Sequence, residues 1–386
     1  MRILLPPRRL FPRLPNFPKP FYGLVGADRQ NWLFVKVETD EGLFGWGEAS
    51  IEGQEKAAEQ CIHLLAERSV IGEDPRNIEK IWQKNYRHGF WKGGFVHMSA
   101  ISGIDQALWD ISGKIYNVPV YMLLGGAVRD RIRTYTHAFN TEMAVNAIKQ
   151  GFAGVKTGGG KSFTVYNPQE DLHALVKRLS EVREAIGPDH LMCIDNHGQS
   201  TPAEAIKKMK AAQPFDIYFF EEPVPPENTL SFKQLREAVP DMVIAAGERL
   251  FSRFDYREVV QERLLDIAQP DISHCGGITE IKKIAAMLEP YHIKFAPHNP
   301  NGPVATAANL QICAVAQNFE ILEFASGIYN YSELFNIALK PQDGFFPLPT
   351  GVGLGIELNE EILKKYPYVN KQYEPRYNTD GSVAEI

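Results

Sequence analysis

Residues 190–195 read His-Leu-Met-Cys-Ile-Asp, residues 217–221 read Ile-Tyr-Phe-Phe-Glu, and residues 243–248 read Val-Ile-Ala-Ala-Gly-Glu. Each is a short apolar run that ends in an acidic residue, a pattern that fits a buried strand. The acids Asp195, Glu221 and Glu248 follow one another at intervals of 26 and 27 residues (221 − 195 and 248 − 221). An interval of about 25 residues accommodates one strand, one helix and two short loops. The spacing therefore predicts a repeated β/α unit.

The repeat extends over most of the chain beyond Arg131. Predicted strands lie at 132–138, 154–157, 191–197, 217–221, 242–248, 265–271, 293–298 and 320–325, with helical patterns such as 169–186, 203–213 and 278–290 between them. Eight strands alternating with helices favour a (β/α) barrel over an open doubly wound sheet. Because the active site of such a barrel lies at the C-terminal ends of its strands, we expect the three acids to converge there.

The first third of the chain has a different pattern. Residues 32–38 alternate as a strand, Asp40-Glu41-Gly42 forms a turn into a second strand, and residues 55–67, 78–86 and 99–116 have helical spacing. From about residue 348 the chain is rich in Gly, Pro and Tyr and has no strand–helix period. We therefore predict an α+β unit over 1–130, a barrel over 131–347, and a tail over 348–386 that packs back on the first unit.

Three carboxylates at one barrel mouth would repel one another unless a cation held them. Ligation by oxygen alone suits a hard divalent ion such as Mg²⁺. The alternative is that these acids cap helix N-termini, which is a common use of single carboxylates. Three acids that all follow apolar runs fit the metal site better. Glu221 and Glu222 are adjacent, so only one can face the shared site, and the pattern alone does not choose between them.

Two histidines stand close to predicted carboxylates. His197 follows Asp195 by two positions, so both side chains should lie on one face of a strand. Asp271 ends the sixth predicted strand and His298 the seventh, and a carboxylate beside an imidazole stabilises the imidazolium and strengthens the base. Glu323 closes the eighth strand and, if protonated, could donate a hydrogen bond to a developing oxyanion. Four further histidines have no comparable partner and are interpreted as background, namely His137, His173, His274 and His292.

These segments together resemble a known family. The shared motifs are Met98-Ser-Ala-Ile-Ser-Gly-Ile-Asp-Gln-Ala-Leu-Trp-Asp110, Asp195-Asn-His197-Gly, Phe220-Glu-Glu-Pro223, Ala245-Ala-Gly-Glu248-Arg, Gln269-Pro-Asp-Ile-Ser-His-Cys-Gly-Gly-Ile-Thr279 and Ala296-Pro-His298. From about Trp32 to its C-terminus the chain is similar to the mandelate racemase-like branch of the enolase superfamily, and within that branch to the D-galactonate dehydratases. The resemblance implies a modified (β/α)8-type TIM barrel with an α+β capping domain formed by the N-terminal region and the C-terminal tail.

The resemblance also implies an activity. Asp195, Glu221 and Glu248 would bind Mg²⁺, which selects Glu221 over Glu222. His298, paired with Asp271, would take the proton next to a substrate carboxylate, and this use of a His base with Mg²⁺ is a known pattern of the superfamily. His197 would protonate the departing 3-hydroxyl and Glu323 would stabilise the enediolate. The product would be a 2-keto-3-deoxy sugar acid, with D-galactonate as the single substrate most favoured.

One position departs from the family pattern. The second strand of the family often carries a Lys-x-Lys pair, whereas this chain has Lys156-Thr157-Gly158. Loss of the second lysine argues against racemisation and for dehydration from the side of His298, while leaving open whether Lys156 takes part. Two alternatives remain: a sugar-acid epimerase or lactone cycloisomerase on the same site, and a non-catalytic protein that retains the fold.

The composition is that of a soluble globular protein. Apolar residues make up 44% and charged residues 23% of the 386 residues, and the net charge of −6 gives no basic footprint for nucleic acid. The cysteines Cys61, Cys193, Cys275 and Cys313 are scattered, which favours a reducing compartment and hence the cytoplasm. No apolar stretch approaches the roughly 20 residues that span a bilayer. The expected partner is a small acid sugar, and the resemblance implies a homo-oligomer.

Two further segments invite a functional interpretation. Residues 6–20 are rich in Pro and Arg, which predicts either a surface arm or a basic flap over an anion-binding site. The run Gly158-Gly-Gly-Lys161-Ser162 suggests a phosphate-binding loop, but that motif requires glycine where Val155 stands. A plain loop after the second strand is therefore favoured.

Overall fold

The computed structural model describes residues 2–5, 24–26, 31–158, 165–337, 339–370 and 375–385. The Pro/Arg-rich segment and the part of the glycine run beyond Gly158 lie outside these residues, so the structure does not test either interpretation.

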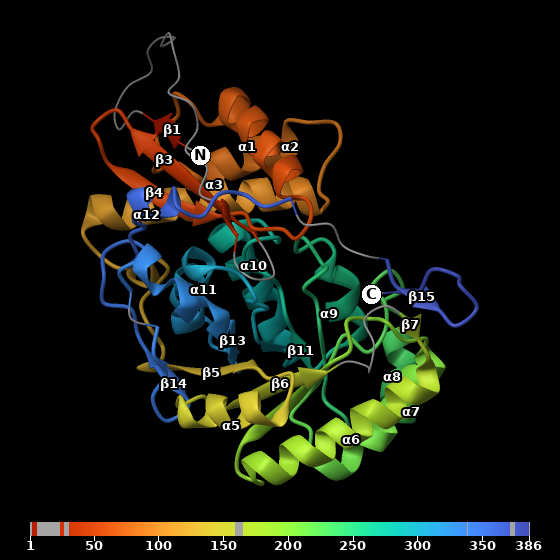
Figure 1. Cartoon of the computed structure of the whole chain (residues 1–386). Helices are drawn as coiled ribbons and strands as arrows, with labels where there is room; N and C mark the ends of the chain where they lie inside the picture. Colours follow the sequence, from red (N-terminus) through yellow and green to blue (C-terminus); the bar gives the residue numbers. More distant parts are fainter. Residues whose placement is uncertain are drawn as a thin grey trace.

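The N-terminal unit is a four-stranded sheet with three helices. Its strands are β1 (Arg2–Leu5), β2 (Leu24–Gly26), β3 (Asn31–Thr39) and β4 (Phe44–Glu48), and its helices are α1 (Glu55–Ser69), α2 (Ile78–Arg87) and α3 (Phe95–Tyr116). The strand β3 is central, parallel to β1 and antiparallel to β2 and β4. This is the predicted α+β unit, and it lies over one end of the remaining structure (Figure 1). It is called the capping unit below.

The strand β3 is buried along its whole length because its two faces belong to different cores. Leu33, Val35 and Val37 pack with the helices of the capping unit. Trp32 and Phe34 belong to the large hydrophobic cluster that also includes the buried side chains between the barrel strands and their helices. Alternation of side chains along one strand therefore connects the two cores.

Eight parallel strands form the second part of the molecule, in the order β12-β11-β10-β9-β8-β6-β5-β13. They are β5 (Arg131–His137), β6 (Gly154–Gly158), β8 (Leu191–Asp195), β9 (Phe220–Glu221), β10 (Ile244–Ala246), β11 (Ile267–Ala268), β12 (Lys294–Phe295) and β13 (Leu322–Phe324). A parallel bridge from Phe295 to Phe319 links β12 to the segment that leads into β13, so the sheet closes on itself. An additional strand, β14 (Phe345–Pro347), runs antiparallel to β5. The predicted modified barrel is confirmed.

Helices surround the barrel on the outside (Figure 1). They are α5 (Thr141–Lys149), α6 (Pro168–Ile186), α7 (Pro202–Ala212), α8 (Ser231–Ala238), α9 (Tyr256–Glu262), α10 (Gly277–Leu288) and α11 (Pro303–Val315), with short helices α4 (Val120–Leu123), η1 (Gln213–Phe215), η2 (Glu289–Tyr291) and η3 (Ser326–Leu334). Local sequence explains where they start. In α7, for example, Thr201 and Glu204 form a capping box and Pro202 occupies the first turn.

The C-terminal tail divides between the two parts of the molecule. Gly353 bridges Pro119, the backbone N–H of Val369 donates to the side chain of Asn31, and Glu360 at the start of α12 (Glu360–Leu363) pairs with Lys36. The last strand, β15 (Tyr377–Asn378), pairs instead with β7 (Val165–Tyr166), beside the barrel. The final segment of the tail thus pairs with β7 and does not pack on the first unit.

The cysteines and the lengths of the helices can be compared with what the composition predicts. All four cysteines are free. In the parts of the chain that the structure describes, every helix is too short or too polar to cross a bilayer.

Candidate active site

The barrel interior has an apolar floor with polar residues directly above it. The floor consists of Tyr135, Cys193, Phe219, Ala245, Ile267, Ala296 and Ile321. Residues two positions further along an extended chain face the same way. On this rule the floor is followed by His137, Asp195, Glu221, Gln269, His298 and Glu323. The strand period therefore brings together side chains that are far apart in sequence.

Lys156 on β6 lies at the centre of the carboxylates. Its Nζ is 2.5 Å from Glu323, 2.8 Å from Glu221 and 3.1 Å from Asp195, and only 5% of the side chain is exposed. Burial opposes its charge, but the three carboxylates outweigh burial and hold the pKa of Lys156 well above its usual range. One ammonium group thus stands among several buried acids.

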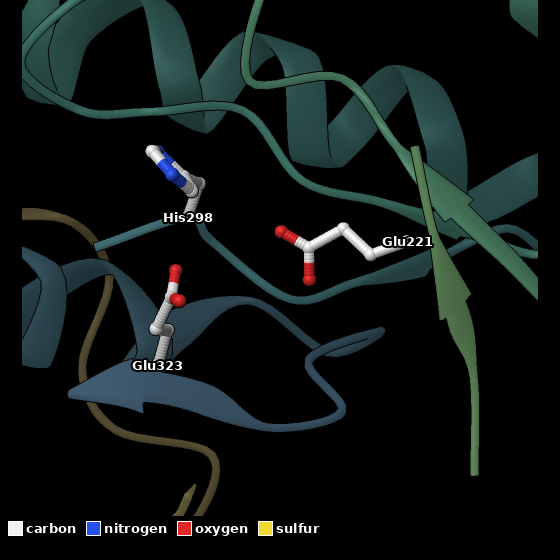
Figure 2. Close-up of side chains that lie close together, drawn as sticks. All are labelled: Glu221, His298 and Glu323. Atoms are coloured by element: carbon white, nitrogen blue, oxygen red, sulfur yellow. The ribbon is translucent and has the colours of Figure 1, made fainter. Parts of the chain in front are cut away.

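Donor atoms of Glu221, His298 and Glu323 all lie within 4.8 Å of one another. Figure 2 shows these three side chains pointing into a common space from separate strand ends. Among the described residues, one oxygen of Glu221 and one of Glu248 are buried without a hydrogen-bond partner. Burial and the charge of Asp195 raise the pKa of Glu221 well above its usual range. Buried carboxylate oxygens in excess of their cationic partners are the donor set that a hard divalent ion requires.

The predicted pair of Asp271 and His298 is present. Nδ1 of His298 lies 2.8 Å from Oδ2 of Asp271, and Nε2 faces Glu248 at 3.4 Å. Burial opposes the imidazolium, yet the carboxylates of Glu248, Glu323 and Asp271 hold the pKa of His298 well above its usual range. Asp271 is itself fixed by Asn301, whose amide donates to Oδ2 at 2.8 Å.

His197 is beside Asp195, but not for the predicted reason. The strand β8 ends at Asp195, and His197 occupies the turn beyond it with φ of +48°. In this turn its backbone N–H donates to Oδ1 of Asp195 at 3.0 Å, and Nε2 lies 3.1 Å from Oδ2. The charge of Asp195 is the main cause that raises the pKa of His197 to about 10. The imidazole is 66% exposed, so it stands at the mouth of the barrel rather than in its wall.

The adjacent acids Glu221 and Glu222 separate clearly. Glu221 faces the interior and Lys156, whereas Glu222 has φ of +39° and binds Arg249 through two hydrogen bonds of 3.1 and 2.6 Å. Arg249 also donates to the backbone carbonyl of His197 at 3.2 Å. Glu222 therefore supports the loop of His197 and leaves Glu221 for the interior.

Two histidines interpreted as background have partners in the site, so that interpretation is wrong for them. Nε2 of His137 lies 2.6 Å from Glu323, and His274 lies 2.9 Å from the hydroxyl of Ser99 and 3.8 Å from Asp271. His137 could have been found from its place at the end of the first barrel strand. His173 lies in α6 and His292 follows η2, both away from the strand ends.

Glu323 lies among cationic side chains. Burial raises its pKa, but Lys156, His298 and His137 outweigh burial and hold the pKa of Glu323 well below its usual range. These surroundings favour the carboxylate form of Glu323, which accepts hydrogen bonds from His137 and from the backbone N–H of Asn299.

The family-model matches agree with this architecture. Residues 18–125 match the mandelate racemase / muconate lactonizing enzyme N-terminal domain, and residues 140–362 match the enolase C-terminal domain-like family. The chain belongs to the mandelate racemase and muconate lactonizing enzyme family, within the enolase superfamily.

Individual relatives are similar over nearly their whole length. The D-galactonate dehydratase of Ralstonia nicotianae is 42% identical over 369 residues, covering 92% of this chain and 96% of the relative. That of Pectobacterium atrosepticum is 43% identical over 373 residues with the same coverage. The crystal structure of an enolase from Agrobacterium radiobacter with bound Na and L-malate has a TM-score of 0.86 at 30% identity, covering 94% of this chain and 98% of that one.

Proposed function

We propose that this protein is a Mg²⁺-dependent acid-sugar dehydratase that converts D-galactonate to a 2-keto-3-deoxy acid. The observation that carries the proposal is the His298–Asp271 pair at 2.8 Å, which faces carboxylates from three other strands. Relatives named D-galactonate dehydratase, 42 and 43% identical over nearly the full chain, support the choice of substrate.

Asp195, Glu221 and Glu248 are the residues that would hold Mg²⁺. Their donors are oxygens, two of these oxygens have no hydrogen-bond partner in the described chain, and Lys156 alone does not balance the local negative charge. Bound Mg²⁺ would supply electrostatic stabilisation of the negative charge that develops on the substrate carboxylate oxygens when the C2 proton is removed. His298 is not assigned as a ligand. Its Nδ1 is bound to Asp271, so Nε2 is the only ring nitrogen that can accept a proton from the substrate.

His298 and His197 divide the proton transfers. In its unprotonated form, Nε2 of His298 would accept the C2 proton, while Asp271 fixes the ring and stabilises the imidazolium that results. A cation held by Glu248 would offset part of the negative charge that raises the pKa of His298. Hydroxide is a poor leaving group, so elimination requires an acid. His197 is suited to this role because it stands at the exposed mouth of the barrel, where its ring can hold a proton and donate it to the departing hydroxyl.

Lys156 supports elimination over isomerisation. An isomerase needs a second base across the site, and the lysine on β6 is held by three carboxylates that favour its protonated form. The position two residues along, Gly158, has no side chain. We assign Lys156 to charge balance and to binding of the anionic substrate.

A substrate screen tests the function. Purified protein with Mg²⁺ is incubated with a set of aldonates and aldarates that includes D-galactonate, and 2-keto acid is measured as its semicarbazone. We expect turnover of D-galactonate. Absence of turnover on every sugar acid would contradict the proposal, and a product that keeps its 3-oxygen would indicate an epimerase or cycloisomerase.

The remaining assignments are proposals of the same kind. We infer a capping domain over 1–130 and a barrel domain over 131–347, with part of the tail on each. We infer a cytoplasmic homo-oligomer that binds a small acid sugar and neither nucleic acid nor membrane. Light scattering after size-exclusion chromatography tests the oligomeric state.

A further inference from the structure

Two buried residues of the capping unit reach both loops that carry the His298–Asp271 pair. The carboxylate of Glu48, at the end of β4, accepts the backbone N–H of Gly302 at 2.7 Å and that of Ala305 at 2.9 Å. Gln106 on α3 accepts the N–H of Glu48 at 3.2 Å and donates to the carbonyl of Ile272 at 3.3 Å. Both side chains belong to fully buried residues.

These contacts fall directly beside the two site residues. Gly302 and Ala305 begin the helix α11, and the loop before it runs from His298 to Asn301. In this loop Asn299 donates its backbone N–H to Glu323 at 2.8 Å, and Asn301 donates to Asp271 at 2.8 Å. Ile272 follows Asp271 in sequence. Glu48 and Gln106 thus bind the chain on either side of the pair.

The fit around Glu48 is tight. The hydroxyl of Ser50 donates to its carboxylate at 2.7 Å. A Cβ built on Gly302 would lie 2.7 Å from the same carboxylate, so glycine is the residue that fits there. Burial raises the pKa of Glu48 to about 7, although hydrogen bonds from Ala305, Ser50 and Gly302 oppose the shift, and the charge of Asp271 adds to it. Glu48 is therefore linked to the site in two ways, by its hydrogen bonds to the backbone of α11 and by the charge of Asp271.

We propose that Glu48, supported by Gln106, is a positioning residue that sets the placement of the His298 imidazole against Asp271. The inference rests on the proposed role of His298 as the base. Glu48 acts through the start of α11 and does not touch the reacting atoms. The capping unit then has two roles. It covers the barrel, and it holds the loop that carries His298 in the position needed for proton abstraction.

Asp110 provides a matched control. It is a fully buried carboxylate of the same unit, and it accepts the backbone N–H groups of Trp46 at 3.0 Å and Leu354 at 2.8 Å. Neither Trp46 nor Leu354 belongs to the loops that carry His298 and Asp271. Glu48→Gln and Asp110→Asn each replace one accepting oxygen by an amide nitrogen and leave the packing volume nearly unchanged. Asp110→Asn also weakens the ion pair with Lys114 at 3.0 Å, so it is the more disruptive of the two for the capping unit. Ser50→Ala is a milder change at the Glu48 site, for use if Glu48→Gln does not fold.

The test compares kinetics on D-galactonate with hydrogen–deuterium exchange of the peptides covering residues 296–306. For Glu48→Gln we expect kcat to fall about 10- to 100-fold with KM little changed, since misplaced catalytic groups cost rate more than binding. Exchange at residues 302–305 should accelerate. Ser50→Ala should change both in the same direction but less, and Asp110→Asn should change neither once activity is normalised to folded protein.

Two results would overturn the inference. One is a kcat for Glu48→Gln that falls only in proportion to the folded fraction, or an equal fall for Asp110→Asn. The other is unchanged exchange at 302–305 in both Glu48→Gln and Ser50→Ala. If the unmodified protein turns over no sugar acid, the proposed function fails, and the exchange measurement alone decides whether Glu48 holds the loop.

Discussion

At the scale of single residues, the site is defined by an excess of buried negative charge around one lysine. Asp195, Glu221 and Glu323 all approach Nζ of Lys156, and Glu248 faces His298. Removing one partner of a buried ion pair leaves the other without compensation, which is far more costly than breaking a pair on the surface. The behaviour of this cluster on substitution is therefore informative.

Lys156→Met should destabilise the protein by about 3–5 kcal/mol, because it leaves buried carboxylates unpaired. Millimolar Mg²⁺ should restore part of this loss, because an ion that binds the folded state stabilises it. Thermal unfolding with and without Mg²⁺ measures both effects. Lys114→Met is the control, since Lys114 is also largely buried but pairs with Asp110 in the capping unit, away from the site. Equal responses of the two variants to Mg²⁺ would contradict the assignment of the cluster as a cation site.

The two histidines should separate when the steps of the reaction are measured individually. His298→Asn should abolish exchange of the substrate C2 proton with D₂O, because the base is lost. His197→Asn should retain exchange but stop elimination, because only the acid is lost. Proton NMR of the substrate measures exchange, and the semicarbazone assay measures elimination. Loss of exchange in His197→Asn, with Mg²⁺ still bound, would show that the roles are assigned wrongly.

At the scale of elements, the pattern of apolar runs was sufficient to predict the barrel strands but not the turns that follow them. All eight predicted strands are present, because each run is mostly buried and stands between helical segments. The predicted strand over 191–197 ends at Asp195, since His197 adopts a positive φ that no residue pattern indicates. Site partners from different strands, such as Lys156 with Glu323 or Glu222 with Arg249, depend on register and could not be predicted from spacing.

The start of the helix α10 contains a pH-sensitive contact. Asp105 on α3 accepts the backbone N–H of Thr279 at 3.0 Å, and burial raises its pKa from 3.8 to about 7. The folded protein then holds a proton on Asp105 that the unfolded chain releases above pH 4. This contribution to stability is complete below about pH 4 and is lost as the pH rises through 7.

The stability advantage of the unmodified protein over Asp105→Asn should therefore shrink between pH 5 and pH 8, on the order of a few kcal/mol. Urea unfolding at several pH values measures the difference. An advantage that stays constant or grows with pH would contradict the predicted protonation of Asp105.

At the scale of the whole molecule, the capping unit and the barrel share buried polar contacts as well as apolar surface. Asp105, Glu48 and Gln106 satisfy backbone groups of barrel loops, and the indole of Trp82 donates to the carbonyl of Gly276 at 2.8 Å. Separating the two parts would exchange these hydrogen bonds for bonds to water, at a net cost of about 0.5–1.5 kcal/mol each, and would expose the apolar side chains packed between them.

We therefore expect a single cooperative unfolding transition for the intact protein. A fragment of residues 131–386 should give no cooperative transition, because its loop amides lose their acceptors. Differential scanning calorimetry measures both, through the ratio of the calorimetric to the van't Hoff enthalpy. Two resolved transitions in the intact protein would show that the units are independent.

The contact between Asn31 and Val369 joins residues 338 positions apart. Contacts of such long sequence separation slow folding, because the chain loses much of its freedom before the contact forms. The sheet that is synthesised first is therefore completed by residues that are synthesised nearly last. During that interval Asn31, at the start of β3, and the apolar side chains of Trp32 and Phe34 lack part of their cover, and such surfaces are where nascent chains associate. The yield of soluble protein should consequently depend on temperature and chaperone supply more than the stability of the finished fold would suggest.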